Sequence, residues 1–385
     1  MTTDGITRNA SKHNAAVTQY AMSSGRELNL LAVQDIVMML SSVAGFFLVL
    51  FRKEVLPPRF FSDGEHIRQI ALGQVSGFAD KSYESVAALY RLLLLGSNDT
   101  FAALVGFLAY IAVILLVRRR LRVSPTNIFA TVLLATSIIL AAAFLGYYSK
   151  DVFVLPIVAL VLMSSVRRKM DIAIVGAMVL YGVFFRNYWL VIAVLYLAFA
   201  ILLKAKHRLR LVIAAVITSI VLVSFSLPLL LGVPPDYFRT SVNIGRADGV
   251  DAATLIHPFV FLPGPLGGVA NNLLTFAALM FPWPLAQLGG AYYAALALMI
   301  AAFWGRFWVS LRAMAKDSNY DSDATVIRCF ALVLAFIVTQ SLFEPDYGSS
   351  LRHLTPIMPC MVYTVWSAAR PAADRSFSRA QLRRA

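Results

Sequence analysis

Residues 101–120 have the sequence FAALVGFLAYIAVILLVRRR, in which 17 uncharged residues are followed directly by Arg118, Arg119 and Arg120. A helix of about 20 apolar residues spans the hydrocarbon core of a bilayer, which is ~30 Å thick. Arginines that follow such a run are typical of its cytoplasmic end. The stretch therefore predicts a transmembrane helix whose C-terminal end faces the cytoplasm.

The composition of the whole chain points to the same lipid environment. Of the 385 residues, 59% are hydrophobic and 14% are charged, and the mean hydropathy is +0.73. A soluble domain carries roughly 25% charged residues. The net charge of +14 could indicate nucleic-acid binding, but most basic residues cluster directly after apolar runs. We therefore expect membrane lipids, and no nucleic acid, as partners.

The same pattern recurs along the chain and predicts an all-α fold, a polytopic transmembrane helical bundle of about ten spans. We expect a membrane domain over 29–370, between a cytoplasmic tail at 1–28 and a basic cytoplasmic tail at 371–385. The apolar stretch 270–287 contains Pro282-Trp283-Pro284 and is expected to be re-entrant or interfacial. The expected spans are 29–51, 99–117, 126–147, 152–166, 170–185, 188–203, 211–232, 289–308, 324–343 and 354–370.

The distribution of charge sets the expected orientation. The segments assigned to the cytoplasm hold 22 of the 34 Lys and Arg, and 12 of the 20 acids lie on the outer side, counting Asp99 at the start of a span. This bias predicts that both termini are cytoplasmic, although Arg52 and Lys53 oppose it. The outer side then carries two long loops, 52–98 and 233–288, and three short tips.

The first outer loop contains two acids beside cations. Asp63 and Glu65 lie two residues apart, next to His66 and Arg68. A carboxylate held ionised by a cation can act as a general base if a substrate hydroxyl reaches it. The alternative is a solvated loop that leads into one amphipathic helix from Glu65 to Leu95.

The other outer segments add single cations and acids at the expected membrane surface. Lys150 and Asp151 occupy one tip, and Arg186 occupies another between aromatic residues. Arg239 and Arg246 in the second long loop are candidates for gripping phosphate, because guanidinium geometry suits it. The alternatives are an interfacial tyrosine belt, a helix N-cap and ordinary loop charge.

The densest group of charges lies between the last two expected spans. Glu344, Asp346, Arg352 and His353 fall within ten residues, together with Tyr347. The prolines that follow predict an irregular helix start with free backbone donors, which favours anion binding. A purely connecting loop would not need this chemistry.

Other chemical signals are missing from the sequence. It contains no metal-ligand spacing, Gly-rich nucleotide loop, G-x-S-x-G or HExxH motif. We therefore expect no metal and no cofactor. Cys329 and Cys360 lie in apolar segments and are expected to be small core residues. If the chain is an enzyme, its donor is expected to be already activated and bound to the membrane.

The outer residues resemble those of the Wzy/EpsG-type polysaccharide polymerases of bacteria and of the wider GT-C class of membrane glycosyltransferases. The resemblance covers most of 29–370 in topology and about thirty residues in motif. Its motifs are Phe61-Ser62-Asp63-Gly64-Glu65, Ser149-Lys150-Asp151, Phe185-Arg186-Asn187-Tyr188, and Glu344-Pro345-Asp346-Tyr347-Gly348 with Leu351-Arg352-His353.

The resemblance implies an enzyme of the bacterial inner membrane that joins undecaprenyl-pyrophosphate-linked oligosaccharide repeat units on the periplasmic side, for exopolysaccharide, capsule or O-antigen. Other polysaccharide-assembly proteins are then expected partners. Asp63, Glu65 or His353 would take the proton from the acceptor hydroxyl. The expected substrate-binding residues are Lys150, Asp151, Arg186, Arg239, Arg246, Glu344, Asp346 and Arg352.

Three other functions stay open at this point. Many of these polymerases have more spans or a larger outer loop, so a GT-C enzyme that moves one sugar from a polyprenyl-phosphate donor is the first alternative. A transporter of polysaccharide or lipid-linked sugar is the second, although transporters usually place charges near the bilayer midplane. Asp35 and Arg328 lie within spans but near the cytoplasmic end, where they could snorkel to water. A structural subunit of the assembly machinery is the third.

Overall fold

A computed structural model of the chain describes residues 32–76, 81–121, 127–163, 169–245, 252–316 and 323–368. Every regular element within these residues is a helix, which confirms the all-α class. The β-type contact found among them is a single bridge between Leu255 and Asp346. Arg246 and the two expected tails, 1–28 and 371–385, lie outside the described residues.

Five helices of the described chain are long and apolar enough to cross a membrane. They are Ala32–Leu50, α5 (Asp99–Arg120), α10 (Arg208–Leu231), α14 (Ala291–Lys316) and α15 (Ala324–Phe343). Shorter apolar helices occupy the other expected spans: α6 (Ile128–Phe144), α7 (Leu155–Met163), α8 (Lys169–Phe184), α9 (Tyr188–Leu202) and α17 (Met358–Ser367). These apolar helices suggest a membrane protein.

The two segments expected to be long outer loops are largely helical. The first contains α2 (Arg52–Val55), η1 (Pro58–Phe60), α3 (Ser62–Ala71) and α4 (Ser82–Leu92). The second contains α11 (Tyr237–Ile244), η3 (Ala252–Thr254), α12 (Pro265–Met280) and α13 (Trp283–Gln287). The remaining short elements are η2 (Lys150–Val154), α16 (Tyr347–Leu354) and η5 (Thr355–Ile357).

The first of these segments differs from the single amphipathic helix considered for Glu65 to Leu95. It forms two helices, α3 and α4, which pack against each other. Gly73, two residues beyond the end of α3, has a φ of +71°. Glycine adopts this left-handed conformation without the steric cost that a side chain adds, so it turns the chain out of the helix.

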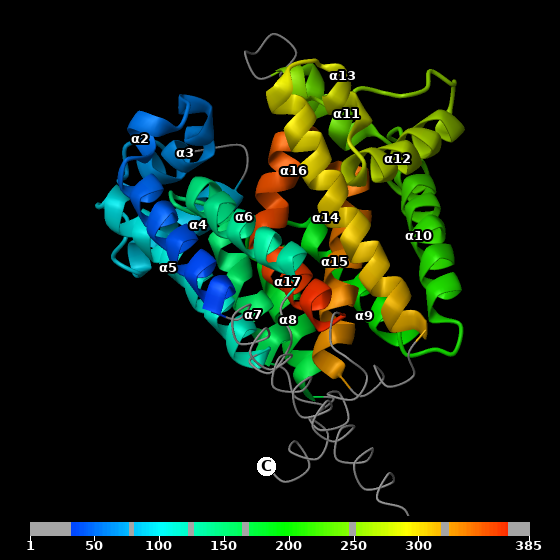
Figure 1. Ribbon diagram of the computed structural model, residues 1–385. Helices are drawn as coiled ribbons and strands as arrows, with labels where there is room; N and C mark the ends of the chain where they lie inside the picture. The colour runs from blue at the N-terminus through cyan, green and yellow to red at the C-terminus, as the bar shows by residue number, and fades with distance from the viewer. Residues whose placement is uncertain are drawn as a thin grey trace, which may run out of the picture.

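Elements from distant parts of the sequence gather at one end of the bundle. In Figure 1, α3, α11, α13 and α16 all lie toward the upper end, although they come from both halves of the chain. The apolar helix α12 packs against α10, α14 and α15. This end therefore receives most of the polar residues that sequence analysis assigned to the outer side.

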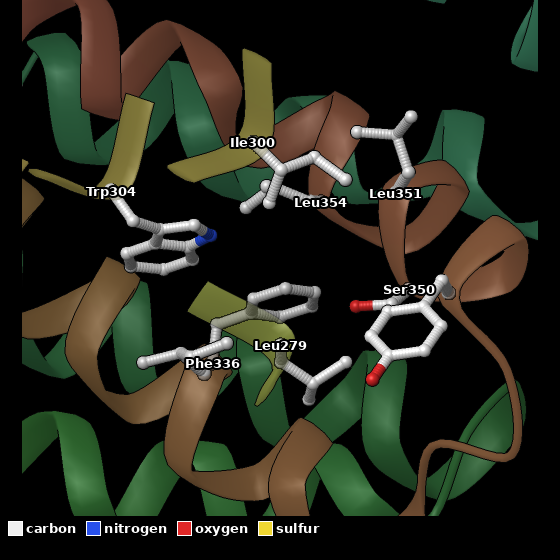
Figure 2. Close-up of a pocket in the computed structure, with 9 residues that line it drawn as sticks. Leu279, Ile300, Trp304, Phe336, Ser350, Leu351 and Leu354 are labelled. Atoms are coloured by element: carbon white, nitrogen blue, oxygen red, sulfur yellow. The ribbon is translucent and has the colours of Figure 1, made fainter. Parts of the chain in front are cut away.

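The short helix α16 is anchored by its apolar side chains. Leu351 and Leu354 line a small cavity of about 10 Å³ together with Ile300 and Trp304 of α14 and Phe336 of α15 (Figure 2). Burial of leucines against two long helices is worth about 1.5–3 kcal/mol for each side chain in ordinary cores. This packing holds the polar face of α16 in a defined position.

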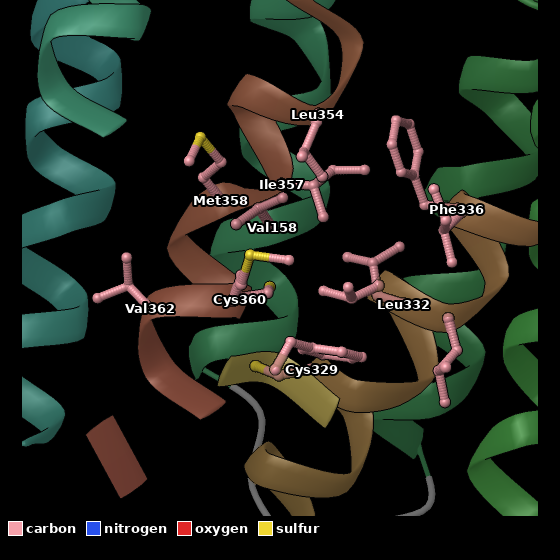
Figure 3. Close-up of a cluster of buried hydrophobic side chains, with 14 of the residues drawn as sticks. Val158, Cys329, Leu332, Phe336, Leu354, Ile357, Met358, Cys360 and Val362 are labelled. Atoms are coloured by element: carbon pink, nitrogen blue, oxygen red, sulfur yellow. The ribbon is translucent and has the colours of Figure 1, made fainter. Parts of the chain in front are cut away.

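Helix α15 is the centre of the bundle. In the most apolar stretch of α15, 94% of the residues are buried inside the structure, compared with 17% in that of Ala32–Leu50. Figure 3 shows part of this core, in which Leu332 and Phe336 of α15 face Leu354 and Ile357, while Met358 and Val362 lie on the other side of the last helix. Cys329 and Cys360 are both free and buried in this core, as expected for small core residues.

Two ion pairs join helices where sequence analysis placed the cytoplasmic end. Nε of Arg118 lies 2.8 Å from Oδ1 of Asp35. Nε of Arg328 lies 2.6 Å from Oδ1 of Asp171, and the Arg328 side chain is 4% exposed. The expectation that Arg328 snorkels to water was therefore wrong, because a carboxylate on α8 neutralises it inside the protein.

Candidate functional site

Four charged side chains from separate elements, including α3 and α16, meet in one network. Nη1 of Arg352 lies 2.7 Å from Oδ2 of Asp63, and Nε of Arg352 lies 3.4 Å from Oδ2 of Asp151. Nη2 of Arg186 lies 3.3 Å from Oδ1 of Asp151. We call Asp63, Asp151, Arg186 and Arg352 the outer charge network. All four were expected to be functional, and the structure brings them together.

A glycine sets the position of Asp63. Gly64 packs so closely against the 147–148 tip that a Cβ atom there would lie 2.6 Å from the carbonyl oxygen of Tyr148 and closer still to the ring of Tyr147. The rings of Phe61 and Tyr147 also meet edge to face, with centroids 5.3 Å apart. Helix α3 can therefore lie directly on this tip, which brings Asp63 beside residues 149–151.

Asp151 is held by the local structure of its own tip. The Oγ atom of Ser149 accepts a hydrogen bond of 3.1 Å from the backbone N–H of Asp151. The backbone N–H of Ser149 donates to the hydroxyl of Tyr90 on α4, at 3.1 Å. The Asp151 residue is 2% exposed. Its carboxylate is therefore buried in a tip that α4 holds from the side.

Tyr83 and Lys150 extend the outer charge network. The hydroxyl of Tyr83 donates a hydrogen bond of 3.0 Å to Oδ1 of Asp63. Nζ of Lys150 lies 3.3 Å from the centroid of the Tyr83 ring and donates to Oγ of Ser82. Lys150 thus touches the network through an aromatic ring, an arrangement that stabilises a cation.

Arg186 retains one buried donor without a partner. Its Nη1 donates a hydrogen bond of 3.2 Å to the hydroxyl of Tyr188, and its Nη2 pairs with Asp151. Its Nε is buried and has no hydrogen-bond partner in the structure. A buried donor that lacks an acceptor is unfavourable by about 1–3 kcal/mol, so an added acceptor at this position would be stabilised.

The network remains ionised at neutral pH. Burial raises the pKa of Asp63, but the charges of Arg352 and Arg186 outweigh it, and the pKa lies well below its ordinary value. Burial likewise opposes ionisation of Asp151, yet the nearby cations, Arg186 first, lower its pKa. The carboxylates in turn raise the pKa values of Arg186 and Arg352 against the effect of burial. Two anions and two cations therefore balance.

A second group of polar side chains lies in the hairpin that joins α15 to α16 and in α16 itself. Nδ1 of His353 lies 2.9 Å from Oε2 of Glu344, whose side chain is 2% exposed. The hydroxyl of Ser349 is hydrogen-bonded to Glu344 and lies 2.8 Å from Oδ2 of Asp346. Oδ1 of Asp346 also caps α16 by accepting from the backbone N–H of Ser349. We call Glu344, Asp346, Ser349 and His353 the hairpin cluster.

Glu65 does not join either group. Its carboxylate pairs with Arg68 at 2.6 Å and accepts a hydrogen bond of 2.8 Å from the hydroxyl of Tyr147. The hydrogen bond from Arg68 is the main cause that lowers the pKa of Glu65 to about 2. The structure thus gives Glu65 a role in joining α3 to the 147–148 tip.

Arg239 lies apart from the carboxylates of the network. Its guanidinium donates to Oγ1 of Thr275 at 2.8 Å, to Oδ1 of Asn272 at 3.0 Å and to the carbonyl oxygen of Ser341 at 3.2 Å. The residue is 3% exposed, and burial lowers the pKa of Arg239 to about 10. Neutral oxygen atoms thus hold a cation that joins α11 to α12 and α15.

Sequence reasoning missed two side chains that complete the site, Tyr83 and Ser349. Each is an ordinary residue type, and only its partner, Asp63 or Glu344, could have drawn attention to it. Among the residues that the structure describes, no group of three or more His, Cys, Asp or Glu is placed to hold a metal ion.

No family model matches the chain, and no curated protein or solved structure matches it either.

Proposed function

We propose that this chain is a glycosyltransferase of the bacterial inner membrane that joins undecaprenyl-pyrophosphate-linked oligosaccharide repeat units at the periplasmic face. The observation that carries the proposal is the outer charge network, in which two half-buried guanidinium groups lie at one end of an apolar helical bundle. A lipid-linked pyrophosphate needs cations at the depth of its headgroup. Arginine suits this task, because its planar fork matches phosphate oxygens.

The proposed topology has about ten crossings with both termini in the cytoplasm. The helices that are too short for a straight span would cross where the bilayer thins or where neighbours shield them. Under this topology α3, α11, α13 and α16 lie at the periplasmic surface. The clustering of these elements at one end of the bundle supports the arrangement.

In the proposed reaction, Arg352 and Arg186 hold the pyrophosphate of the donor. The acceptor oxygen attacks C1 of the donor sugar, the bond between C1 and the pyrophosphate oxygen breaks, and its electron pair stays on that oxygen. The guanidinium groups stabilise the growing charge, and loss of one such donor typically costs ~10²–10³-fold in rate. Asp63 and Asp151 keep both groups oriented before the donor binds.

His353 is the base that the geometry favours. In the neutral imidazole whose Nδ1–H donates to the carboxylate of Glu344, Nε2 carries a lone pair. Nε2 would take the proton of the acceptor hydroxyl. Asp63 and Glu65 each pair with an arginine and have lowered pKa values, which makes them weak proton acceptors at neutral pH.

The test is complementation of a strain that lacks the gene. With Arg352→Ala, we expect single repeat units to accumulate on the undecaprenyl carrier and polymer to fall by ~10²-fold or more. Arg91→Ala is the matched control, because Arg91 is exposed on α4 outside the network, and it should leave polymer at the wild-type level. Full-length polysaccharide in the Arg352→Ala strain would overturn the proposal.

The same strains separate the alternative functions. A transferase that adds one sugar would leave repeat units one residue short, and Asp63→Ala would produce the same truncated unit. A transporter would leave complete repeat units on the cytoplasmic side of the membrane. A structural subunit would tolerate loss of every charge in the network.

A further inference from the structure

A hollow of about 190 Å³ lies beside α16 and takes no part in the chemistry proposed above. It is bounded by the loop 255–259, by α13 and by Tyr347, the first residue of α16. Its polar and aromatic lining residues are His257, Phe259, Trp283, Gln287 and Tyr347, and no Asp, Glu, Lys or Arg contributes to the lining.

The loop that forms one wall is held rigidly from three sides. The backbone N–H of Ile256 donates to the carbonyl oxygen of Pro345 at 2.8 Å, and the side chain of Asn243 donates to the carbonyl oxygen of Ile256 at 3.0 Å. Oδ1 of Asn271 accepts from the backbone N–H of Phe259 at 2.8 Å. A wall fixed in this way is preorganised, which lowers the entropy lost when a ligand binds.

Tyr347 forms the wall between the hollow and the small cavity of Figure 2. The residue is 4% exposed, and its hydroxyl is buried away from the hollow. The small cavity is lined mainly by apolar side chains, including Leu279 and Phe336, together with Ser350. Tyr347 therefore shapes the hollow, and the polar groups that a ligand can reach there are those of His257 and Gln287.

The lining selects the chemical class of the ligand. Trp283 is 39% exposed, and its ring lies 5.4 Å from that of Phe259, so two aromatic rings border a space with two polar side chains, those of His257 and Gln287. A phosphate would need cations, which the lining lacks, and an isoprenoid tail would leave the polar groups unpaired. The hollow is smaller than the ~300 Å³ at which sites for drug-sized ligands begin. A single sugar ring matches both the size and the mixture of contacts.

We propose that this hollow binds one sugar residue of the acceptor glycan, an inference that rests on the proposed function. Tyr347 directly follows Asp346 of the hairpin cluster, and Leu255 in the wall of the hollow forms a bridge with Asp346. A glycan seated in the hollow would therefore have its neighbouring sugar beside the hairpin cluster, which contains the proposed base His353. The anionic donor and the neutral acceptor would then occupy adjoining sites of different chemistry.

The test measures acceptor binding apart from transfer. Purified protein in nanodiscs is titrated by calorimetry with oligosaccharides released by partial hydrolysis from the host's own surface polysaccharide. We expect Trp283→Ala and Gln287→Leu to weaken binding tenfold or more, and Trp283→Phe to retain most of the affinity. Tyr292→Ala is the matched control, because Tyr292 is an exposed aromatic residue that does not line the hollow.

The outcomes separate the two proposals. If Arg352→Ala abolishes transfer while Trp283→Ala binds acceptor like the wild type, the acceptor site is wrong and the proposed function stands. Competition by undecaprenyl phosphate for the hollow would also overturn the inference in favour of a lipid site. If the wild type binds no saccharide and Arg352→Ala leaves polymer unchanged, both proposals fail. Melting temperatures near that of the wild type show that each variant is folded.

Discussion

Arg352 lies between Asp63 and Asp151, whereas Arg239 is held by neutral oxygen atoms. The first arrangement keeps a cation oriented by charges that an incoming anion can replace. In the second arrangement, the Arg239 guanidinium donates several hydrogen bonds that join neighbouring helices. The two arginines were assigned the same phosphate-binding role from sequence, and the structure gives them different environments.

The hairpin cluster yields a prediction for the base. His353→Gln should lower the transfer rate by ~10²–10⁴-fold, the usual contribution of general base catalysis, while donor binding stays within a few-fold of the wild type. The measurement is turnover of lipid-linked repeat units by purified protein. Glu84→Gln is the control, since Glu84 is exposed on α4 outside the network. Equal losses in both variants would remove His353 from this role.

The pKa of Asp63 gives a prediction for stability against pH. Because this pKa is lower in the folded protein than in the unfolded chain, its stabilisation is complete above the unfolded value and is lost as the pH falls through the folded value. The wild type should melt above Asp63→Asn by a constant margin from about pH 5 to 8, and the margin should shrink below about pH 4. A margin that grows on acidification would contradict the ionised pair.

At the scale of elements, the contact between α3 and the 147–148 tip decides whether the site forms. A methyl group at Gly64 would collide with Tyr147 and the backbone of Tyr148, and such overpacking costs about 1–3 kcal/mol. Gly64→Ala should therefore lower the melting temperature and also reduce transfer, because Asp63 moves with α3.

The control for this substitution is another glycine of the chain. Gly176 is exposed on α8, and a Cβ atom there would meet nothing within 4 Å. Gly176→Ala should therefore be neutral or stabilising by up to about 1 kcal/mol through helix propensity. Thermal unfolding of both variants checks the pair, and similar losses would show that Gly64 has no special contact.

The apolar stretch 270–287 is not one element. Helix α12 ends at Met280 and α13 begins at Trp283, with Phe281 and Pro282 between them. Proline has no N–H to donate and disfavours helical geometry in the residue before it, so a helix ends there. The break places Trp283 at the rim of the hollow. That this segment is re-entrant or interfacial stays a prediction.

At the scale of the molecule, the topology can be tested with introduced cysteines. Native Cys329 and Cys360 are fully buried, so background labelling by a membrane-impermeant maleimide should be low. In intact spheroplasts, Gln74→Cys and Asn187→Cys should react, and Lys206→Cys should react only after permeabilisation. Gln74, Asn187 and Lys206 are all exposed. Labelling of Lys206→Cys in intact cells would invert the proposed orientation.

The sequence by itself determined the all-α class and the apolar character of the helices. Both follow from local properties, because a run such as 101–117 needs no distant partner to favour a helix in lipid. It also singled out the four residues of the outer charge network, Asp63, Asp151, Arg186 and Arg352, since charges are conspicuous in so apolar a chain.

Only the tertiary structure decided which of these residues meet. Asp63 and Arg352 are 289 positions apart, and no local pattern specifies contacts over that distance. The fold also separated residues that looked alike, pairing Arg328 with Asp171 and His353 with Glu344. The reason is physical: helix formation depends on neighbours in the chain, whereas the pairing of buried charges depends on how whole helices pack.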